Sequence, residues 1–499
     1  MSLSSRSLAL CGLILSCAGA HAAEQCNYRE VAQLPLAYHG TSMQVSAEGQ
    51  VNDTPAMLLI DTGAQVTSLT RLGSDKRRLV LQPTGRTVAG VGGDTRAYAT
   101  PIRSLALGPV QVAGRGAIRV IDEMGTRPEV DGIVGSDFLM QVDVELSLAE
   151  KRIRFFSPQG CDKAFLGYWD ANAMVVPLDR DRRGIRPMVT VELNGVKLNA
   201  LIDSGAGYSV VHPEAASKAG AQEDSVALLE TTYASGIGQN MVKMRTARFK
   251  TFALGDERVD NPVLRIMPLN SEDRIDLILG ADFLRAHRIL LANSQKRMYF
   301  SYVSGKPFDE GKTGDRGWID QEAQAGNRSA QYLVGQGKLK SADAEVQREG
   351  RALITSAADA GYLPAMHFLA HQHYRAARYA DSVALYSKIE TLDPSDLAAK
   401  LNLFNARVKA QGVDEAKARL TAEMDSLRWP VWPAPITEYY LGKLTLEQLL
   451  RKAASDDDLA KRRRCEVFTR AAALQDALGD VAQKDAMLAN LNSECRKKS

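Results

Sequence analysis

An internal repeat constrains the fold of this chain more than any other feature of its sequence. Residues 45–303 divide into two halves in which three short motifs recur in the same order. The first motif is an apolar run that ends in Asp-Thr-Gly-Ala or Asp-Ser-Gly-Ala. The second motif is a glycine-rich stretch that begins at Gly90 or Gly236, 29 or 33 residues after the aspartate. The third is an apolar run that ends in Gly135 or Gly280, 74 or 77 residues after the aspartate. Ordered matches at near-equal spacing indicate a duplicated domain.

Both halves are predicted to be all-β. Short runs rich in Val, Ile and Leu are broken by Gly, Pro and Asn at roughly ten-residue intervals, as in small β domains. Asn194-Gly195 suits the tight two-residue turn of a hairpin. Residues 153–156 and 297–300 read as matching final strands. We therefore expect two small β lobes, at residues 27–160 and 161–304.

The sequence changes character after these lobes. Residues 305–329 are polar and glycine-rich, which predicts a linker. Residues 330–499 are rich in Ala, Leu, Glu, Lys and Arg with apolar positions three or four apart, which predicts helices. Residues 379–394 resemble the second helix of a tetratricopeptide repeat, and weaker copies follow. A helical bundle without true repeats is the alternative. Stacked helix pairs present a groove, so we expect this region to bind an unknown protein partner.

The N-terminus is typical of a secretory signal peptide. Arg6 is followed by an apolar run over residues 8–18 and then by Ala20-His21-Ala22, a small-x-small cleavage signature. This predicts a signal peptide at residues 1–22 and export, to the periplasm in a bacterium or to the medium otherwise. The run is short for a membrane span. A lipid anchor is disfavoured because Leu15 stands where a small residue is preferred, and a buried N-terminal helix is a further alternative.

Four cysteines remain after removal of the signal peptide, and they allow three pairings. Cys26 precedes the first strand-like segment of the first lobe and Cys161 follows its last, so a bridge between them would close that lobe. Cys465 and Cys495 flank Gly479 at similar distances, which sets them opposite each other in a helical hairpin. Export favours these two disulfides. Free buried thiols are the alternative.

The composition is that of a folded soluble protein, with 45% hydrophobic and 24% charged residues. A net charge of +3 from 62 basic and 59 acidic residues gives no field that would recruit nucleic acid or an anionic membrane. His371 and His373 lie two apart in a helical stretch and would face different directions, which disfavours a metal site. Residues 90–93 lack the strand-to-helix context of a nucleotide-binding loop. We expect no metal and no cofactor.

Two copies of Asp-Thr/Ser-Gly indicate a specific chemistry that a single copy would not, because Asp-Gly turns are common on protein surfaces. A strand can place Asp61 or Asp203 at its end, and the hydroxyl of Thr62 or Ser204 can bond across a symmetry axis. If the lobes face each other, the two carboxyl groups meet and share one proton. One of them can then act as general base on a water molecule while the other acts as general acid.

Residues 45–303 resemble the retropepsin-like and pepsin-like aspartic peptidases, and their short lobes look most like bacterial-type retropepsin domains in tandem. The resemblance implies a multidomain chain with a bilobal acid-protease fold of two pseudo-symmetric small β-barrel lobes, followed by an all-α tetratricopeptide-like domain. It implies an aspartic endopeptidase that binds a peptide or protein substrate between the lobes.

The resemblance also assigns roles to residues of all three motifs. Asp61 and Asp203 would be catalytic, supported by Thr62, Gly63, Ser204 and Gly205. The hairpins that close over substrate, called flaps below, would carry Gly90, Val91 and Gly92 in the first lobe and Gly236, Ile237 and Gly238 in the second. Asp137 and Asp282 of the third motif are expected to be helix caps or structural acceptors rather than acids in the mechanism.

Two departures and two alternatives stay open. No clear counterpart of the aromatic flap residue of pepsin-like enzymes is visible, since Tyr98 and Tyr233 are only loosely placed, and no propeptide is evident. A module that keeps the fold but only binds peptides is the alternative function. Pairing of each lobe with its twin in another chain is the alternative assembly. The duplication favours a monomer, because one chain supplies both half-sites.

Overall fold

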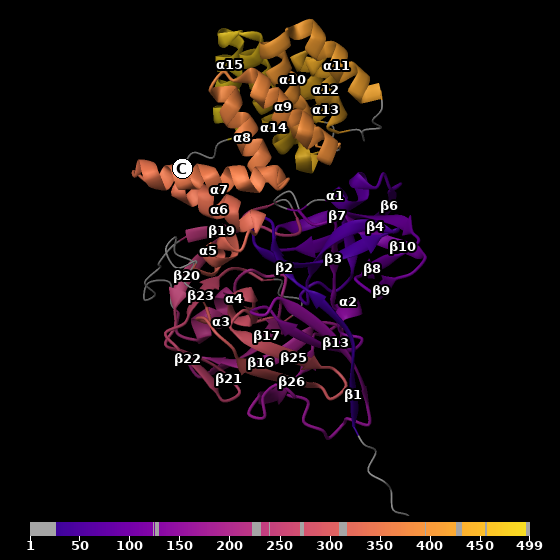
Figure 1. The fold of residues 1–499 in the computed structure, drawn as a ribbon, viewed down its shortest axis with the longest axis vertical. Coiled ribbons are helices and arrows are strands. Elements are labelled where there is room, and N and C mark those ends of the chain that lie inside the picture. The colour runs from indigo at the N-terminus through magenta and orange to yellow at the C-terminus, as the bar shows by residue number, and fades with distance from the viewer. Residues whose placement is uncertain are drawn as a thin grey trace, which may run out of the picture.

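The computed structural model describes residues 26–122, 124, 129–221, 231–238, 240–269, 274–308, 317–394, 396–425, 432–454 and 457–495. The expected signal peptide lies outside these residues. Two β lobes lie together, and a helical region is stacked on one end of them (Figure 1). Within the described part, no helix is both long and apolar enough to cross a membrane.

The first lobe is one curled sheet of ten strands in the order β6-β7-β10-β5-β11-β4-β3-β8-β9, with β2 paired to β3. Its elements are β2 (Ala37–His39), β3 (Gln44–Val51), β4 (Thr54–Ile60), β5 (Ser68–Thr70), α1 (Arg71–Lys76), β6 (Gln82–Gly90), β7 (Gly93–Ile102), β8 (Leu105–Leu107), β9 (Val110–Ala113), β10 (Gly116–Ile121), β11 (Gly132–Val134) and α2 (Ser136–Leu139).

The second lobe repeats this topology strand for strand, in the order β19-β20-β23-β18-β24-β17-β16-β21-β22 with β15 paired to β16. Its elements are β15 (Asp179–Arg180), β16 (Pro187–Leu193), β17 (Val196–Ile202), β18 (Val210–Val211), α3 (Pro213–Lys218), β19 (Thr231–Ala234), β20 (Val242–Arg248), β21 (Thr251–Leu254), β22 (Glu257–Asp260), β23 (Val263–Ile266), β24 (Leu277–Leu279) and α4 (Ala281–Leu284). Asn194 and Gly195 both have positive φ and join β16 to β17 in a tight hairpin, as predicted.

A third sheet joins the lobes, with three strands from each half in the order β1-β13-β12-β25-β26-β14. These strands are β1 (Asn27–Pro35), β12 (Asp143–Ser147), β13 (Arg152–Gln159), β14 (Met174–Pro177), β25 (His287–Ala292) and β26 (Arg297–Tyr302). The lobes meet where β12 and β25 pair antiparallel, with Val144 opposite Leu291. A disulfide between Cys26 and Cys161, one of the two expected bridges, fastens the outer edge of this sheet.

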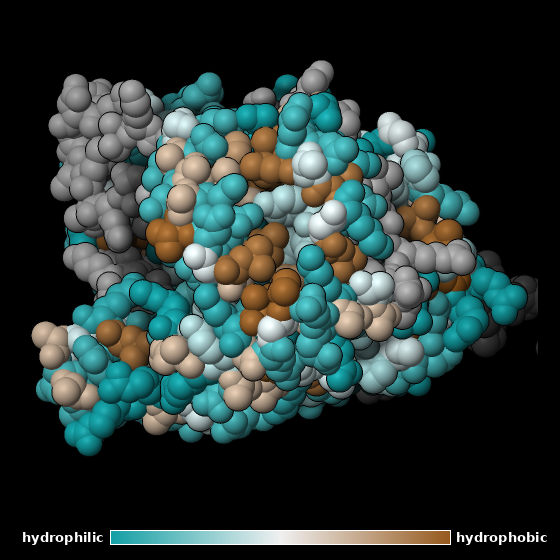
Figure 2. Space-filling model, turned by 90° about the horizontal axis from the view of Figure 1, so that it is seen from above, coloured by the Kyte–Doolittle hydropathy of each residue, from teal (hydrophilic) through white to brown (hydrophobic). Residues whose placement is uncertain are grey.

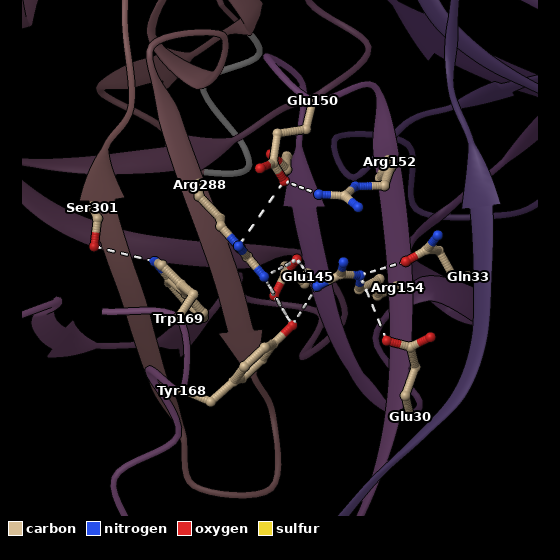
Figure 3. Close-up of polar contacts among 11 residues, drawn as sticks. Glu30, Gln33, Glu145, Glu150, Arg152, Arg154, Tyr168, Trp169, Arg288 and Ser301 are labelled. Atoms are coloured by element: carbon tan, nitrogen blue, oxygen red, sulfur yellow. Dashed lines mark hydrogen bonds and ion pairs between the residues drawn. The ribbon is translucent and has the colours of Figure 1, made fainter. Parts of the chain in front are cut away.

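A charged cluster covers one face of the joining sheet (Figure 3). Its centre is Glu145 on β12, whose side chain is 1% exposed. One carboxylate oxygen lies 3.3 Å from Arg154 Nη1, the other accepts a hydrogen bond of 2.6 Å from the Tyr168 hydroxyl, and Arg288 Nη2 lies 3.1 Å from the first. Because Arg154 belongs to the first lobe and Arg288 to the second, Glu145 links the lobes electrostatically.

The helical region comprises α5 (Gly317–Gln324), α6 (Arg328–Lys338), α7 (Ala344–Asp359), α8 (Leu363–Arg375), α9 (Tyr379–Leu392), α10 (Leu397–Gln411), α11 (Val413–Asp425), α12 (Ala434–Tyr440), α13 (Leu446–Ala453), α14 (Asp457–Leu478) and α15 (Val481–Cys495). Helices α8 and α9 form a hairpin, in which Ser382 Oγ donates to the carbonyl of Ala370 over 2.9 Å. Helices α14 and α15 form another, closed by the second expected disulfide, Cys465 to Cys495.

The prediction of a linker over residues 305–329 is wrong for its C-terminal part, which is helical and packed. Ile319 and Ala323 of α5 belong to the same apolar core as the two lobes. Trp318 contacts Tyr38 of β2, with ring centroids 4.9 Å apart. The guanidinium of Arg285 lies over the Trp318 ring, 4.1 Å from its centroid. The polar composition misled the prediction because only one face of α5 is apolar.

Two hydrogen bonds continue this docking onto the turn between β2 and β3. Asn327 Nδ2 donates to the Tyr38 carbonyl over 2.9 Å, and Gly40 N donates to Ser329 Oγ over 3.1 Å. The helical region is thus fixed to the first lobe. Viewed from the helical end, apolar side chains gather near the middle of the face among hydrophilic ones (Figure 2).

Candidate active site

Asp61 and Asp203 follow equivalent strands, β4 and β17, in the middle of the two lobe sheets. Their backbone N–H groups donate to Val134 of β11 and to Leu279 of β24, over 3.1 and 3.0 Å. The glycines of the third motif lie directly beneath the two loops. A Cβ atom on Gly135 would lie 2.9 Å from the carbonyl oxygen of Ala64, and one on Gly280 would lie 2.6 Å from the backbone of Tyr208. Glycine is therefore required at both positions for the loops to be supported this closely.

The hydroxyl residues after the aspartates cross-link the two loops. Thr62 Oγ1 donates to the carbonyl of Ile202 over 2.7 Å and accepts from Ser204 N over 3.0 Å. Ser204 Oγ donates to the carbonyl of Ile60 over 2.7 Å and accepts from Thr62 N over 3.1 Å. Both residues are buried. This reciprocal set of four bonds holds the aspartates of the two lobes at a fixed separation.

Each aspartate is also held within its own loop. Asp61 Oδ1 accepts from Gly63 N and Ala64 N over 2.9 and 2.8 Å. Asp203 Oδ1 accepts from Gly205 N and Ala206 N over 2.9 and 3.0 Å. These bonds leave the second oxygen of each carboxyl group for other partners.

The two carboxyl groups lie against each other's loops. A Cβ atom on Gly63 would lie 2.3 Å from Asp203 Cγ, and one on Gly205 would lie 2.3 Å from Asp61 Cγ. The glycines are therefore needed for the close approach of the loops, in addition to their role in the turn. The structure thus brings together Asp61, Asp203 and the dyad-supporting residues Thr62, Gly63, Ser204 and Gly205, as the sequence predicted.

Proximity changes the proton affinity of the pair. Burial, reinforced by the charge of Asp203, raises the pKa of Asp61 to about 8. Burial also raises the pKa of Asp203, but the amides of Ala206 and Gly205, a hydrogen bond from Asp61 and the charge of Arg186 oppose that rise. The arrangement favours a proton on Asp61 and negative charge on Asp203, so that the pair shares one proton.

This coupling predicts a pH-dependent stability. A folded-state pKa above the unfolded value near 3.9 means that the folded state binds the extra proton more tightly. Its stabilising contribution is complete below about pH 4 and is lost as the pH rises through about 8. We expect the unfolding temperature of the wild type to fall relative to that of Asp61→Asn between pH 4 and 8. Exposed Asp179→Asn is the control, and a constant difference between wild type and Asp61→Asn would contradict the shift.

Asp137 and Asp282 are structural acceptors, one of the two roles expected for them. Asp137 Oδ1 accepts from the amide and hydroxyl of Thr67, over 2.9 and 2.6 Å. Asp282 Oδ1 accepts the same two bonds from Ser209, over 2.8 and 2.6 Å. Neither side chain caps its short helix. We call the loops that carry Asp61 and Asp203 the dyad loops. The contacts of Asp137 and Asp282 tie the segment after each dyad loop to α2 or α4.

The flaps of the two lobes meet each other. Gly90 and Gly93 pair at the tip of the β6–β7 hairpin, and the segment between β19 and β20 carries residues 236–238. Gly92 N donates to the Ile237 carbonyl over 2.8 Å, and Asn240 N donates to the Gly92 carbonyl over 3.0 Å. A Cβ atom on Gly90 would lie 2.4 Å from Ile237 Cβ, so glycine allows the contact. The pairing of the flap tips was not predicted from the sequence.

The flap side chains differ between the lobes. Ile237 packs on an apolar wall of the first lobe that contains Leu59, Ile121 and Ile133, whereas Val91 is 39% exposed. Neither tyrosine considered from the sequence takes the place of an aromatic flap residue at the tips: Tyr233 is 62% exposed, and Tyr98 lies under Arg71, 5.8 Å from its guanidinium.

Sequence reasoning missed two residues beside the dyad loops. Gln44 at the start of β3 donates through Nε2 to the Gly205 carbonyl over 3.3 Å. Arg186 directly precedes β16 and places Nη1 3.5 Å from the Gly63 carbonyl. No motif marks either residue, and their equivalence emerges only from the strand register.

A comparison with protein families supports the division of the chain into two lobes. Two segments, residues 47–138 and 189–283, match the family model described as aspartyl protease. A crystal structure of an aspartic proteinase from Irpex lacteus is similar at 14% identity and a TM-score of 0.35, over 55% of this chain and 97% of that one. The comparison with curated proteins gave no match. Residues 47–138 and 189–283 are therefore two tandem β lobes that match the aspartyl protease family, followed in this chain by a helical region.

Proposed function

We propose that this protein is an exported aspartic endopeptidase that hydrolyses peptide bonds with a water molecule activated between Asp61 and Asp203. The observation that carries the proposal is the reciprocal set of bonds between Thr62 and Ser204, which holds two proton-sharing carboxyl groups together. Such a pair offers a base and an acid at the same pH, as hydrolysis by direct water attack requires.

The reaction would proceed in two proton-balanced steps. The ionised carboxylate takes a proton from water as the water oxygen attacks the scissile carbonyl carbon, while the protonated carboxyl donates its proton to the carbonyl oxygen. The resulting diol then returns a proton to the dyad as its carbonyl re-forms, and the amide nitrogen is protonated as the carbon–nitrogen bond breaks. No acyl-enzyme forms. Acid–base transfer of this kind contributes about 10²- to 10⁴-fold to the rate.

The substrate would be an extended peptide segment of another protein, bound between the lobes and under the flaps. Positioning of that segment would supply much of the remaining rate enhancement. The helical region, fixed to the first lobe through Tyr38 and Gly40, is suited to hold a protein partner near this cleft. The two disulfides support export to an oxidising compartment, the periplasm in a bacterium. We propose that the active unit is a monomer, because one chain carries both aspartates.

The test is an unbiased peptide library digested by the purified mature protein from about pH 3 to 8 in ¹⁸O-labelled water. We expect new termini that carry one ¹⁸O atom in the carboxyl group, and no cleavage by a variant with both Asp61→Asn and Asp203→Asn. Products whose formation survives that double substitution would overturn the proposal. Peptide binding by the wild type without cleavage would favour the binding-module alternative.

A further inference from the structure

Gln44 and Arg186 each contact the dyad loop of the opposite lobe, and they occupy equivalent positions in their own lobes. Ser46 of β3 pairs with Leu59, two residues before Asp61, and Met188 of β16 pairs with Leu201, two residues before Asp203. Gln44 and Arg186 lie two residues before Ser46 and Met188. Each reaches across to the glycine carbonyl of the opposite dyad loop. The pseudo-symmetry of the site is therefore broken at one position, where a neutral amide faces a cation.

Arg186 is fixed in place by its own hairpin. Its side chain is 9% exposed, and Nε lies 2.7 Å from Asp181 Oδ2. The other oxygen of Asp181 accepts from the backbone N–H of Ile185 over 2.9 Å and of Arg186 over 3.3 Å. The carboxylate therefore holds the Nε side of the guanidinium, while Nη1 faces the carbonyl of Gly63. This ion pair is oriented, with its positive end toward the dyad.

The position of Gly63 connects Arg186 to one aspartate in particular. A Cβ atom on Gly63 would lie 2.3 Å from Asp203 Cγ, so the Asp203 carboxyl group packs directly against Gly63. Arg186 Nη1 contacts the carbonyl of this same glycine. Gln44 stands in the equivalent relation to Gly205 and hence to Asp61, but it carries no charge.

We propose that Arg186 is a positioning residue that keeps Asp203 as the ionised member of the pair and leaves the shared proton on Asp61. Asp203 is then the general base and Asp61 the general acid of the first step. This assignment of roles rests on the proposed peptidase function, although the charge asymmetry itself does not.

The electrostatics of the surrounding groups agree. Burial raises the pKa of Asp203, and the charge of Arg186 is among the groups that oppose this rise, whereas the pKa of Asp61 is raised by burial and by Asp203 itself. Two other cations of the β15–β16 hairpin bind groups outside the aspartate-bearing loops' carbonyls. Arg180 binds the carbonyl of Ile185 and Asn293, and exposed Arg183 binds the side chain of Gln65. Burial would raise the pKa of Asp181, but the backbone amides and the guanidinium of Arg186 that bind this carboxylate outweigh burial and lower its pKa.

The test is a titration of each aspartate alone by ¹³C NMR of full-length protein labelled at the aspartate carboxyl carbon. Asp61→Asn leaves Asp203 to be followed, and Asp203→Asn leaves Asp61. We expect Arg186→Gln to raise the titration midpoint of Asp203 by about one pH unit, because a nearby arginine lowers an aspartate pKa by at least that much. We expect a smaller change at Asp61. No change at Asp203, or equal changes at both, would overturn the proposal.

Three further variants separate charge from structure. Arg186→Lys keeps the charge and should restore the Asp203 midpoint. Arg183→Gln removes an exposed charge from the same hairpin and should leave it unchanged. Gln44→Arg leaves Arg186 in place, so it remains informative if Arg186→Gln does not fold, and it should lower the midpoint of Asp61. Failure of Gln44→Arg to do so in folded protein would contradict the proposal.

Activity gives an independent readout. If the chain cleaves peptides, Arg186→Gln should move the acid limb of the kcat/KM profile to higher pH by the same amount, because Asp203 must be ionised to act. If no peptide is cleaved but the NMR midpoints respond as expected, the charge asymmetry stands and the proposed function falls. Cleavage with an unmoved acid limb in Arg186→Gln would overturn the role of Arg186 alone.

Discussion

If the proposed peptidase function is correct, we expect replacement of either Asp61 or Asp203 with Asn to lower the rate of peptide hydrolysis by about 10²- to 10⁴-fold, the range for loss of general acid–base catalysis. Replacing both lowers the rate little further, because neither carboxyl group can perform its step without the other. Asn keeps an oxygen that can accept the bonds from Gly63 N and Ala64 N, or from their counterparts, so the loops should retain their shape. The expected pattern is strong non-additivity in a fold that remains intact.

The measurement is kcat/KM on one peptide found in the library digestion, for the wild type, both single variants and the double variant. Circular dichroism would establish that the variants are folded. Asp179→Asn is the matched control, since Asp179 is exposed on β15, and its rate should stay within about twofold of the wild type. A single variant that keeps a tenth of the activity, or losses that multiply in the double variant, would show that the two groups do not act as one unit.

The second large effect concerns stability. Glu145→Ala removes the carboxylate between Arg154 and Arg288 and leaves two largely buried cations across the junction of the lobes. We expect a loss of about 3 kcal/mol, the lower end of the range for breaking a buried ion pair. The loss of stability should not be larger, because each arginine still has a second carboxylate nearby: Arg154 lies 3.5 Å from Glu30, and Arg288 lies 4.0 Å from Glu150.

Hydrogen exchange of β12 and β25 in the full chain would measure this loss locally, which avoids treating a multidomain protein as two-state. Glu150→Ala is the matched control. Its carboxylate lies on the same face of the sheet and contacts Arg152 at 2.6 Å, but it is 34% exposed, so its removal should cost less than about 1 kcal/mol. Equal acceleration of exchange by both substitutions would refute a special role for Glu145.

The repeat made the main features of the site predictable from the sequence. Asp61 and Asp203 have no sequence proximity, yet the duplication placed both at the ends of equivalent strands, and the small hydroxyl residues after them indicated how the loops bond. The near-equal spacing also placed Gly135 and Gly280 of the third motif at equivalent positions after the two aspartates. Asn194-Gly195 indicated its hairpin because few residues adopt positive φ at both turn positions.

Other features depend on which strands lie side by side, and no local pattern carries that information. Gln44 and Arg186 became recognisable as a pair only through the registers of β3 with β4 and of β16 with β17. Glu145 reads as an ordinary strand residue until β25 of the other half supplies Arg288. Residues 317–329 look like a linker because the apolar partners of Trp318 and Ile319 lie in the lobes, far away in the sequence.

The contact between the flap tips has a consequence for how a peptide could gain entry. Gly92 N and the Ile237 carbonyl are the kinds of backbone group that an extended chain binds, and in this structure they bind each other. Admission of a peptide would exchange those hydrogen bonds for new ones, with little net gain from the backbone. If the chain is the proposed peptidase, selection among peptides would then depend on side chains that can displace Ile237 from its apolar wall, and a tightly folded protein would not bind until a segment of it unfolds.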